Sequence, residues 1–183
     1  MTDLIQRILP TVQKPARYTG GEFNEVKKDL NDVRVRVAFC FPDTYEIGMS
    51  NLGMRILYGV MNEMDGVWCE RVFAPWGDME QAMEKHGLPL WALESQHPVK
   101  DFDMVAFTIG YEMAYSNVLN MLRLAGIPIH SKVFRLYNLH NFFHHHIFGI
   151  LFFSLFSFKS LLEYRIFHNR FHFQLQISHL YAE

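Results

Sequence analysis

The stretch Arg34-Val-Arg-Val-Ala-Phe-Cys-Phe-Pro-Asp-Thr-Tyr-Glu-Ile-Gly-Met-Ser-Asn-Leu-Gly53 decides the fold of this chain. Its first half has the β-branched and aromatic residues of a buried strand, and its second half continues into a helical pattern. The acidic loop between them has the spacing Asp-x-Tyr-x-x-Gly, from Asp43 to Gly48. In doubly wound α/β folds, ligands bind at the carboxyl ends of the strands. This loop is therefore the first candidate for a functional site.

Strand and helix patterns alternate along the rest of the first 132 residues. Strands are predicted at 33–41, 67–74, 88–93 and 102–109 and from 127 onward, and helices at 2–9, 49–64, 78–87 and 115–125. In the helix at 49–64, the apolar residues Leu52, Ile56, Leu57 and Val60 recur on one face, the periodicity of an amphipathic helix. The alternation predicts an α/β fold: a Rossmann-like parallel sheet with helices on both faces.

Composition separates the chain into unequal parts. Residues 1–32 are expected to form a helix and loop extension, and residues 33–132 the Rossmann-like domain, which is incomplete because its strand pattern breaks near residue 130. Residues 133–183 form an aberrant tail: they hold eleven of the 17 phenylalanines and seven of the ten histidines. The small net charge of −2 gives no indication of a nucleic-acid partner. Two widely spaced cysteines and the absence of a signal-peptide pattern predict a cytoplasmic protein.

Three interpretations of the tail remain open. It could associate with a membrane, although its apolar run at 147–158 is shorter than the ~20 residues that a spanning helix needs. It could bind a metal through His144, His145 and His146, although adjacent residues on a helix point in different directions. It could also be an unselected sequence, such as an out-of-frame product, that is disordered or helical and carries no site. The sequence favours the third interpretation.

The candidate ligand-binding residues lie in two loops that each follow a predicted core strand. Polar residues also lie at the start of the helix that follows each loop, where the free backbone N–H groups of the first turn favour an anion. The first loop would turn at a glycine, and the second loop lies between residues 110 and 116. The candidate cofactor-binding residues are Asp43, Tyr45, Glu46, Gly48, Ser50, Tyr111, Glu112 and Ser116. We expect Asp43 and Tyr111 to lie at the same edge of the sheet. No catalytic residue and no metal ligand is predicted.

Six segments of the chain together resemble a known family. They are Lys14–Glu22, Ala38–Ser50, Val67–Trp76, Leu93–Ser95, Tyr111–Met113 and Asn117–Leu122. They are similar to the N-terminal region of a family of large radical S-adenosylmethionine proteins, described as a cobalamin-binding-like domain that precedes the radical core. The resemblance covers about Lys14 to His130. It implies a Rossmann-like fold of the cobalamin-binding type.

The resemblance makes cobalamin a candidate cofactor, with one departure from the pattern. Cobalamin-binding modules carry Asp-x-His-x-x-Gly in the first loop, and the histidine coordinates cobalt. Here the matching residues are Asp43, Tyr45 and Gly48, so the imidazole ligand is absent. Base-off binding without a protein ligand and loss of cobalamin binding both remain open.

The resemblance also bears on whether the chain is an enzyme. A radical core holds its iron–sulfur cluster with a CxxxCxxC motif, whereas this chain has only Cys40 and Cys69. The cluster and S-adenosylmethionine would belong to the parent family's catalytic domain, the expected partner. The first hypothesis is a truncated accessory domain of a radical S-adenosylmethionine enzyme that binds cobalamin or a substrate and performs no radical chemistry itself. The alternatives are an interaction or scaffold module without a small-molecule site, or a gene-model fragment without function.

Overall fold

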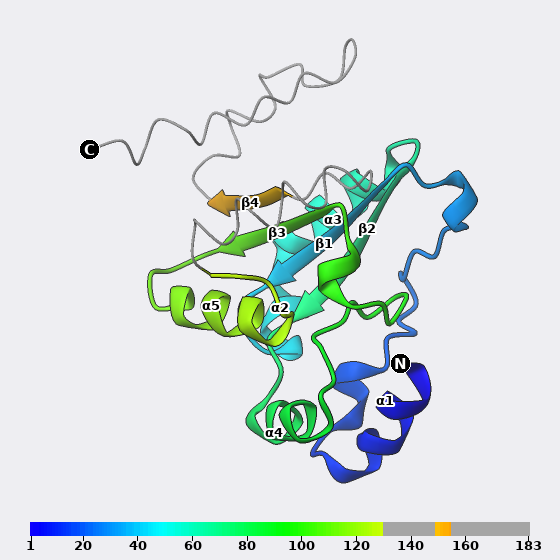
Figure 1. Ribbon diagram of the computed structural model, residues 1–183. Helices are drawn as coiled ribbons and strands as arrows, with labels where there is room; N and C mark the ends of the chain where they lie inside the picture. The colour runs from blue at the N-terminus through cyan, green and yellow to red at the C-terminus, as the bar shows by residue number, and fades with distance from the viewer. Residues whose placement is uncertain (130–148, 155–183) are drawn as a thin grey trace.

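A parallel sheet forms the centre of the protein. The computed structural model describes residues 1–129 and, for the backbone, residues 149–154 (Figure 1). The strands are β1 (Val35–Phe41), β2 (Val67–Phe73), β3 (Met104–Ile109) and β4 (Gly149–Ser154). They pair in the order β2-β1-β3-β4, and every pair is parallel. The predicted Rossmann-like α/β fold is therefore confirmed.

Helices cover both faces of this sheet, as the alternating pattern predicts. They are α1 (Thr2–Ile8), α2 (Tyr45–Ser50), α3 (Leu52–Glu63), α4 (Gly77–His86) and α5 (Ala114–Leu124). Short 3-10 turns occur at Leu9–Thr11, Pro15–Tyr18, Leu30–Asp32 and Val99–Asp101. Figure 1 shows α5 and α3 on opposite sides of the sheet. One apolar core lies under α1, α4 and α5, and the other lies under α3.

The strands are buried because their side chains meet one of these two cores on each face. In β1, Ala38 and Cys40 belong to the core under α1, α4 and α5, whereas Val37 and Phe39 belong to the core under α3. Successive residues of a strand point to opposite faces, so a strand covered on both sides must be apolar at nearly every position. This explains the near-continuous apolar run that identifies β1 in the sequence.

The helix predicted at 49–64 is divided in two. Asn51 has extended backbone angles, φ −77° and ψ 112°, and it separates α2 from α3. Its side-chain Oδ1 accepts a hydrogen bond from the backbone N–H of Met54 at 2.9 Å. This is the N-cap interaction that satisfies a free donor at a helix start. Ser50 therefore ends α2 and does not begin a helix, which corrects the role expected for it at a helix N-terminus.

The predicted strand at 88–93 is not a strand. Trp91 makes a single bridge, to Pro98, and Leu90 donates its backbone N–H to Leu124 O at 3.0 Å. Leu93 donates to Arg71 O at 2.9 Å, but the backbone N–H of Arg71 donates to the Glu94 carboxylate and not to a neighbouring carbonyl. The Glu94 carboxylate thus takes the place of the backbone carbonyl that a neighbouring strand would offer to β2. The segment is extended and buried, which is why its sequence resembles a strand.

The structure also changes the prediction for the end of the chain. Residues 127–129 do not form a strand. Beside β3, on the side away from β1, the sheet continues with β4, which lies inside the range 133–183. Residues 149–154 are thus neither helical nor outside the sheet, contrary to the expectation for the tail. The other tail predictions, including those for His144–His146, lie outside the described residues. No helix among residues 1–129 and 149–154 is long and apolar enough to cross a membrane.

The sequence predicts one apolar face for this helix, but α3 has two apolar faces in the structure. Met54 and Tyr58 are buried against the sheet, and Leu57 packs beside them. Leu52 and Val60, by contrast, are 66% and 52% exposed. Of the four residues that the sequence places on the buried face, Leu52, Ile56 and Val60 are therefore on the exposed side of α3. Only Leu57 packs against the core, beside Met54.

The cap at Asn51 gives a testable prediction. We expect Asn51→Ala to lower the free energy of unfolding by about 1 kcal/mol, because α3 loses the acceptor for a first-turn N–H. The matched control is Ser50→Ala, since the exposed Ser50 hydroxyl donates only to Ile47 O, within α2. Urea unfolding of the two variants measures the difference. Equal effects would contradict the division of the helix at Asn51.

Candidate functional site

Asp43 joins three loops at the carboxyl edge of the sheet. Its backbone carbonyl accepts a hydrogen bond from Ala74 N at 2.9 Å, just after β2. Its side-chain Oδ1 accepts from Thr44 N at 2.7 Å, and Oδ2 accepts from the Tyr111 hydroxyl at 3.1 Å. This hydrogen bond raises the pKa of Tyr111. Asp43 and Tyr111 therefore lie at the same edge, as the sequence predicts.

The second loop contributes fewer free polar groups than expected. The Ser116 hydroxyl donates to Met113 O at 3.0 Å, so it is used within the start of α5. Glu112 is exposed, and its carbonyl accepts from Tyr115 N at 3.2 Å. Asn117 makes the link to the first loop, because its side-chain amide donates to Pro42 O at 2.9 Å. The structure thus brings the two loops together mainly through Asp43 and Asn117.

Tyr45 and Gly48 face the interior of the protein. The Tyr45 ring packs edge-on against Phe73, with ring centroids 5.4 Å apart and an interplanar angle of 76°. Its hydroxyl donates to Glu22 Oε1 at 2.7 Å. Burial and this carboxylate raise the pKa of Tyr45 to about 12. A Cβ atom at Gly48 would overlap the Phe73 ring, so this glycine allows α2 to pack closely on the end of β2.

Glu46 lies on the outside of the same loop and binds the N-terminal segment. It accepts from Arg17 Nε at 2.9 Å and from Lys14 Nζ at 3.2 Å. The hydrogen bond from Arg17 is the main reason why the pKa of Glu46 falls to about 2. Residues 14–22 therefore reach the first loop from both sides, with Arg17 and Lys14 on Glu46 and Glu22 on Tyr45.

A buried ionic network lies behind this loop, and the sequence reasoning missed it. Arg71 of β2 donates from Nε to Glu94 Oε1 at 2.5 Å and from Nη2 to Glu22 Oε2 at 2.8 Å. Its guanidinium also lies 4.9 Å from the centroid of the Tyr58 ring. Burial raises the pKa of Glu94 to about 7, although Arg71 opposes the shift. The available signal was the pair Glu70-Arg71 inside an otherwise apolar strand.

Glu70, the neighbour of Arg71, forms a second network on the opposite face of β2. Arg36 Nη2 donates to Glu70 Oε1 at 2.6 Å and to Ser95 Oγ at 3.0 Å. Ser95 N in turn donates to Glu70 Oε2 at 3.0 Å. The Arg36 guanidinium lies 4.2 Å from the centroid of the Phe102 ring. The segment 93–95 is thus fastened to both faces of the edge strand.

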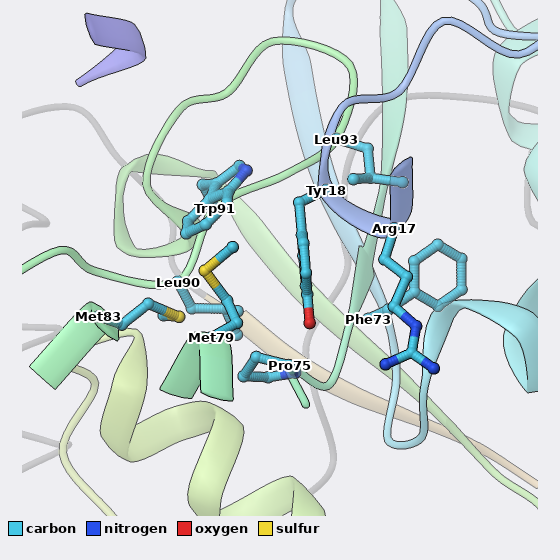
Figure 2. Close-up of a pocket in the computed structure, with 9 residues that line it drawn as sticks. All are labelled: Arg17, Tyr18, Phe73, Pro75, Met79, Met83, Leu90, Trp91 and Leu93. Carbon is cyan, nitrogen blue, oxygen red and sulfur yellow. The ribbon is translucent and has the colours of Figure 1, made fainter. Parts of the chain in front are cut away.

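A small cavity lies below the loop, between the N-terminal segment and α4. Figure 2 shows its lining residues, with the Tyr18 ring among them and Trp91 6.4 Å away between ring centroids. Its volume is about 20 Å³, which is room for about one water molecule. The lining residues are Arg17, Tyr18, Phe73, Pro75, Met79, Met83, Leu90, Trp91 and Leu93. This cavity is too small for a cofactor.

The first loop does not offer a lower ligand for the cobalt of cobalamin. A lower ligand would have to come from the position of Tyr45, but its hydroxyl is bound to Glu22 and its ring is packed on Phe73. Cys40 and Cys69 are buried, and burial raises the pKa of both thiols, so neither favours the thiolate that binds iron. Within residues 1–129, no cluster of three or more His, Cys, Asp or Glu side chains is arranged to hold a metal ion.

Comparison with known proteins identifies one family. Residues 53–135 match the family described as radical SAM proteins, N-terminal. The matched range begins in α3 and includes β2, α4, β3 and α5. Comparisons with curated proteins and with solved structures give no match. The resemblance to the N-terminal region of radical SAM proteins is therefore confirmed over residues 53–135, whereas its cobalamin-binding-like description is not tested. The match includes Arg71 and Tyr111 but not the loop from Asp43 to Gly48.

The buried carboxyl of Glu94 gives a prediction about pH. Its pKa is about 7 in the folded protein, against an ordinary value of 4.5, so the folded state keeps a proton that the unfolded state loses between these values. The free energy of unfolding should therefore decrease as pH rises through this window, by at most about 1.4 kcal/mol per pH unit from this group. Above the window, both states are ionised and the dependence ends.

The test compares the wild type with Glu94→Gln, which removes the titration. Urea unfolding between about pH 4 and pH 8 should show the stability of the wild type falling relative to the variant until about pH 7. Glu63→Gln, an exposed change at the end of α3, serves as the control. A difference between wild type and Glu94→Gln that is constant across the range would contradict the prediction.

Proposed function

We propose that the part of the chain that matches the N-terminal domain of radical SAM proteins, residues 53–135, is an interaction module that packs against a radical SAM catalytic domain. In this proposal it performs no radical chemistry, and its contact surface is the outer face of α3. The two cysteines of the chain cannot supply the three thiolates that a radical SAM cluster needs. The family match supports this choice of partner, because an N-terminal domain in that family is expected to accompany a radical core.

The observation that carries the proposal is that α3 is apolar on two opposite faces. Met54 and Tyr58 are buried against the sheet. Leu52, Ile56 and Val60 are 66%, 43% and 52% exposed. At about 100° per residue, positions 52, 56 and 60 centre roughly 150° from positions 54, 57, 58 and 61. Apolar residues that recur at i, i+4 and i+8 form a stripe along a helix, and such a stripe is typical of a helix face that another element covers.

The position of this stripe determines what kind of structure can cover it. We call Leu52, Ile56 and Val60 the outer stripe. A helix beside α3 in the same layer would cover its flank, whereas the outer stripe points away from the sheet and needs a further layer. Ile47 of α2 is a further exposed apolar residue, at 50%. Contiguous exposed apolar side chains are a mark of contact surfaces, and a second domain supplies the extra layer.

The state of the first loop supports an interaction module over a cofactor-binding one. Tyr45 is bonded to Glu22, Gly48 is packed on Phe73, and Ser50 donates within α2. The packing of Gly48 and the hydrogen bond of Ser50 stabilise the fold, and the Tyr45 hydroxyl is already bound to a carboxylate of the chain itself. The proposal therefore assigns the contact role to the apolar surface and leaves the loop a structural role.

The experiment uses the 183-residue chain and a separately produced radical SAM catalytic domain from a protein that matches the same family. We expect the double change Leu52→Lys and Ile56→Lys to weaken their association by at least about tenfold, since each buried leucine-sized side chain contributes ~1.5–3 kcal/mol. Met113→Lys is the control, because Met113 is 82% exposed but lies before α5. Calorimetry or sedimentation measures the affinity. Equal weakening by Met113→Lys, or none by the double change, would contradict the proposed surface.

A second candidate function is small-molecule binding at the carboxyl edge, and the hydrogen bond between Tyr111 and Asp43 favours it. The two loops meet there, in the position where doubly wound folds bind ligands. Adding hydroxocobalamin and recording the absorption spectrum separates the candidates. A spectral change that disappears in Asp43→Ala would support binding at this edge, and an unchanged spectrum supports the interaction module.

A further inference from the structure

Residues 20–28 form a strap that crosses the protein beside the first loop. The strap is fastened through its backbone at Val26, whose N–H donates to the Tyr58 hydroxyl at 2.8 Å and whose carbonyl accepts from Trp68 Nε1 at 3.0 Å. At its end, Lys28 Nζ donates to the carbonyls of Asn62 and Val67, each at 2.6 Å. The strap therefore follows the edge formed by α3 and β2.

The strap places one carboxylate between two donors that belong to different elements. Glu22 Oε1 accepts from the Tyr45 hydroxyl at 2.7 Å, and Glu22 Oε2 accepts from Arg71 Nη2 at 2.8 Å. One donor on each oxygen, with a guanidinium as one of them, is a strong arrangement for binding a carboxylate. The Glu22 side chain is 21% exposed, so this position is open to solvent at its rim.

Both donors are held in place by contacts that do not involve the strap. Arg71 Nε is bound to Glu94, and Arg71 Nη1 lies 3.2 Å from Met49 Sδ. The Tyr45 ring is held by Phe73. The two donors are thus fixed before the carboxylate arrives, and such preorganisation lowers the cost of binding. We call the position between Arg71 Nη2 and the Tyr45 hydroxyl the carboxylate seat.

The backbone before Glu22 allows the strap to change direction. Gly20 and Gly21 have φ values of 63° and 85°, in the region that glycine adopts without strain. Phe23, the residue after Glu22, is fully exposed and does not anchor the strap in the core. Glu22 therefore enters the seat from a glycine turn on one side and an exposed residue on the other.

We propose that the carboxylate seat is a binding site for a carboxylate-bearing molecule, and that Glu22 occupies it as an internal competitor. An external carboxylate that enters the seat would take over both hydrogen bonds of Glu22 and displace this part of the strap. The site is separate from the outer stripe of α3 and does not depend on the docking proposal. The proposal also explains why two strong hydrogen-bond donors, the Arg71 guanidinium and the Tyr45 hydroxyl, lie together at this position.

Chemical rescue tests the seat directly, with acetate as the probe. Near neutral pH, Glu22→Ala should unfold at a lower urea concentration than the wild type, and sodium acetate should raise that midpoint more than sodium chloride at equal ionic strength. The double variant Glu22→Ala with Tyr45→Phe lacks one donor of the seat and should lose most of this acetate effect. Glu63→Ala is the control for removing a carboxylate elsewhere. An acetate effect that is equal in all variants, or absent from Glu22→Ala, would overturn the proposal.

A second measurement needs no variant and covers the case in which Glu22→Ala does not fold. Acetate that competes with Glu22 in the wild-type chain should loosen the strap and speed hydrogen exchange of the Val26 amide, which is bonded to Tyr58. Amides in β3 should be unaffected. Exchange at Val26 that is the same in acetate and in chloride would argue against an internal competitor.

Discussion

The pairing of the buried Arg71 guanidinium with Glu94 is the constraint on which the rest of this structure depends. A buried charge is tolerated only when it is paired and hydrogen-bonded. Arg71 lies on an edge strand, so satisfying it requires a carboxylate from outside the sheet. Glu94 also accepts from the backbone N–H of Arg71, so a single side chain forms hydrogen bonds with both the guanidinium and the open strand edge. Glu22 then completes the charge pairing from the N-terminal segment.

This constraint explains how segments far apart in the sequence close the carboxyl edge of the sheet. The segment around Glu94 is fixed beside β2, and Ser95 binds Glu70 on the other face of the same strand. The strap reaches Arg71 through Glu22 and thereby meets Tyr45. An edge strand that is covered in this way is protected from pairing with another chain. The cost is that a loop with the position of a ligand site has its polar groups turned inward.

The surface that we propose for contact with a partner domain is therefore apolar and lies on α3. α3 packs Met54 and Tyr58 on the sheet and carries the outer stripe on its other side. The carboxylate seat is a second, distinct surface feature, polar and small. In the two proposals, a protein partner and a carboxylate would bind independently, since the outer stripe and the carboxylate seat share no residue.

Local patterns in the sequence determined the parallel α/β fold, the strands β1, β2 and β3, and the meeting of Asp43 with Tyr111, because strand order and chain direction place successive loops at one edge. Only the tertiary structure decided which way each loop residue points. Tyr45 turns inward because Arg71 and Glu22, distant in sequence, form a buried charge network that no local period reveals. The face of α3 that is buried was equally undetermined, since both of its faces are apolar. Burial of a charge and coverage of a helix are properties of the assembled layers, and that is why the sequence alone leaves them open.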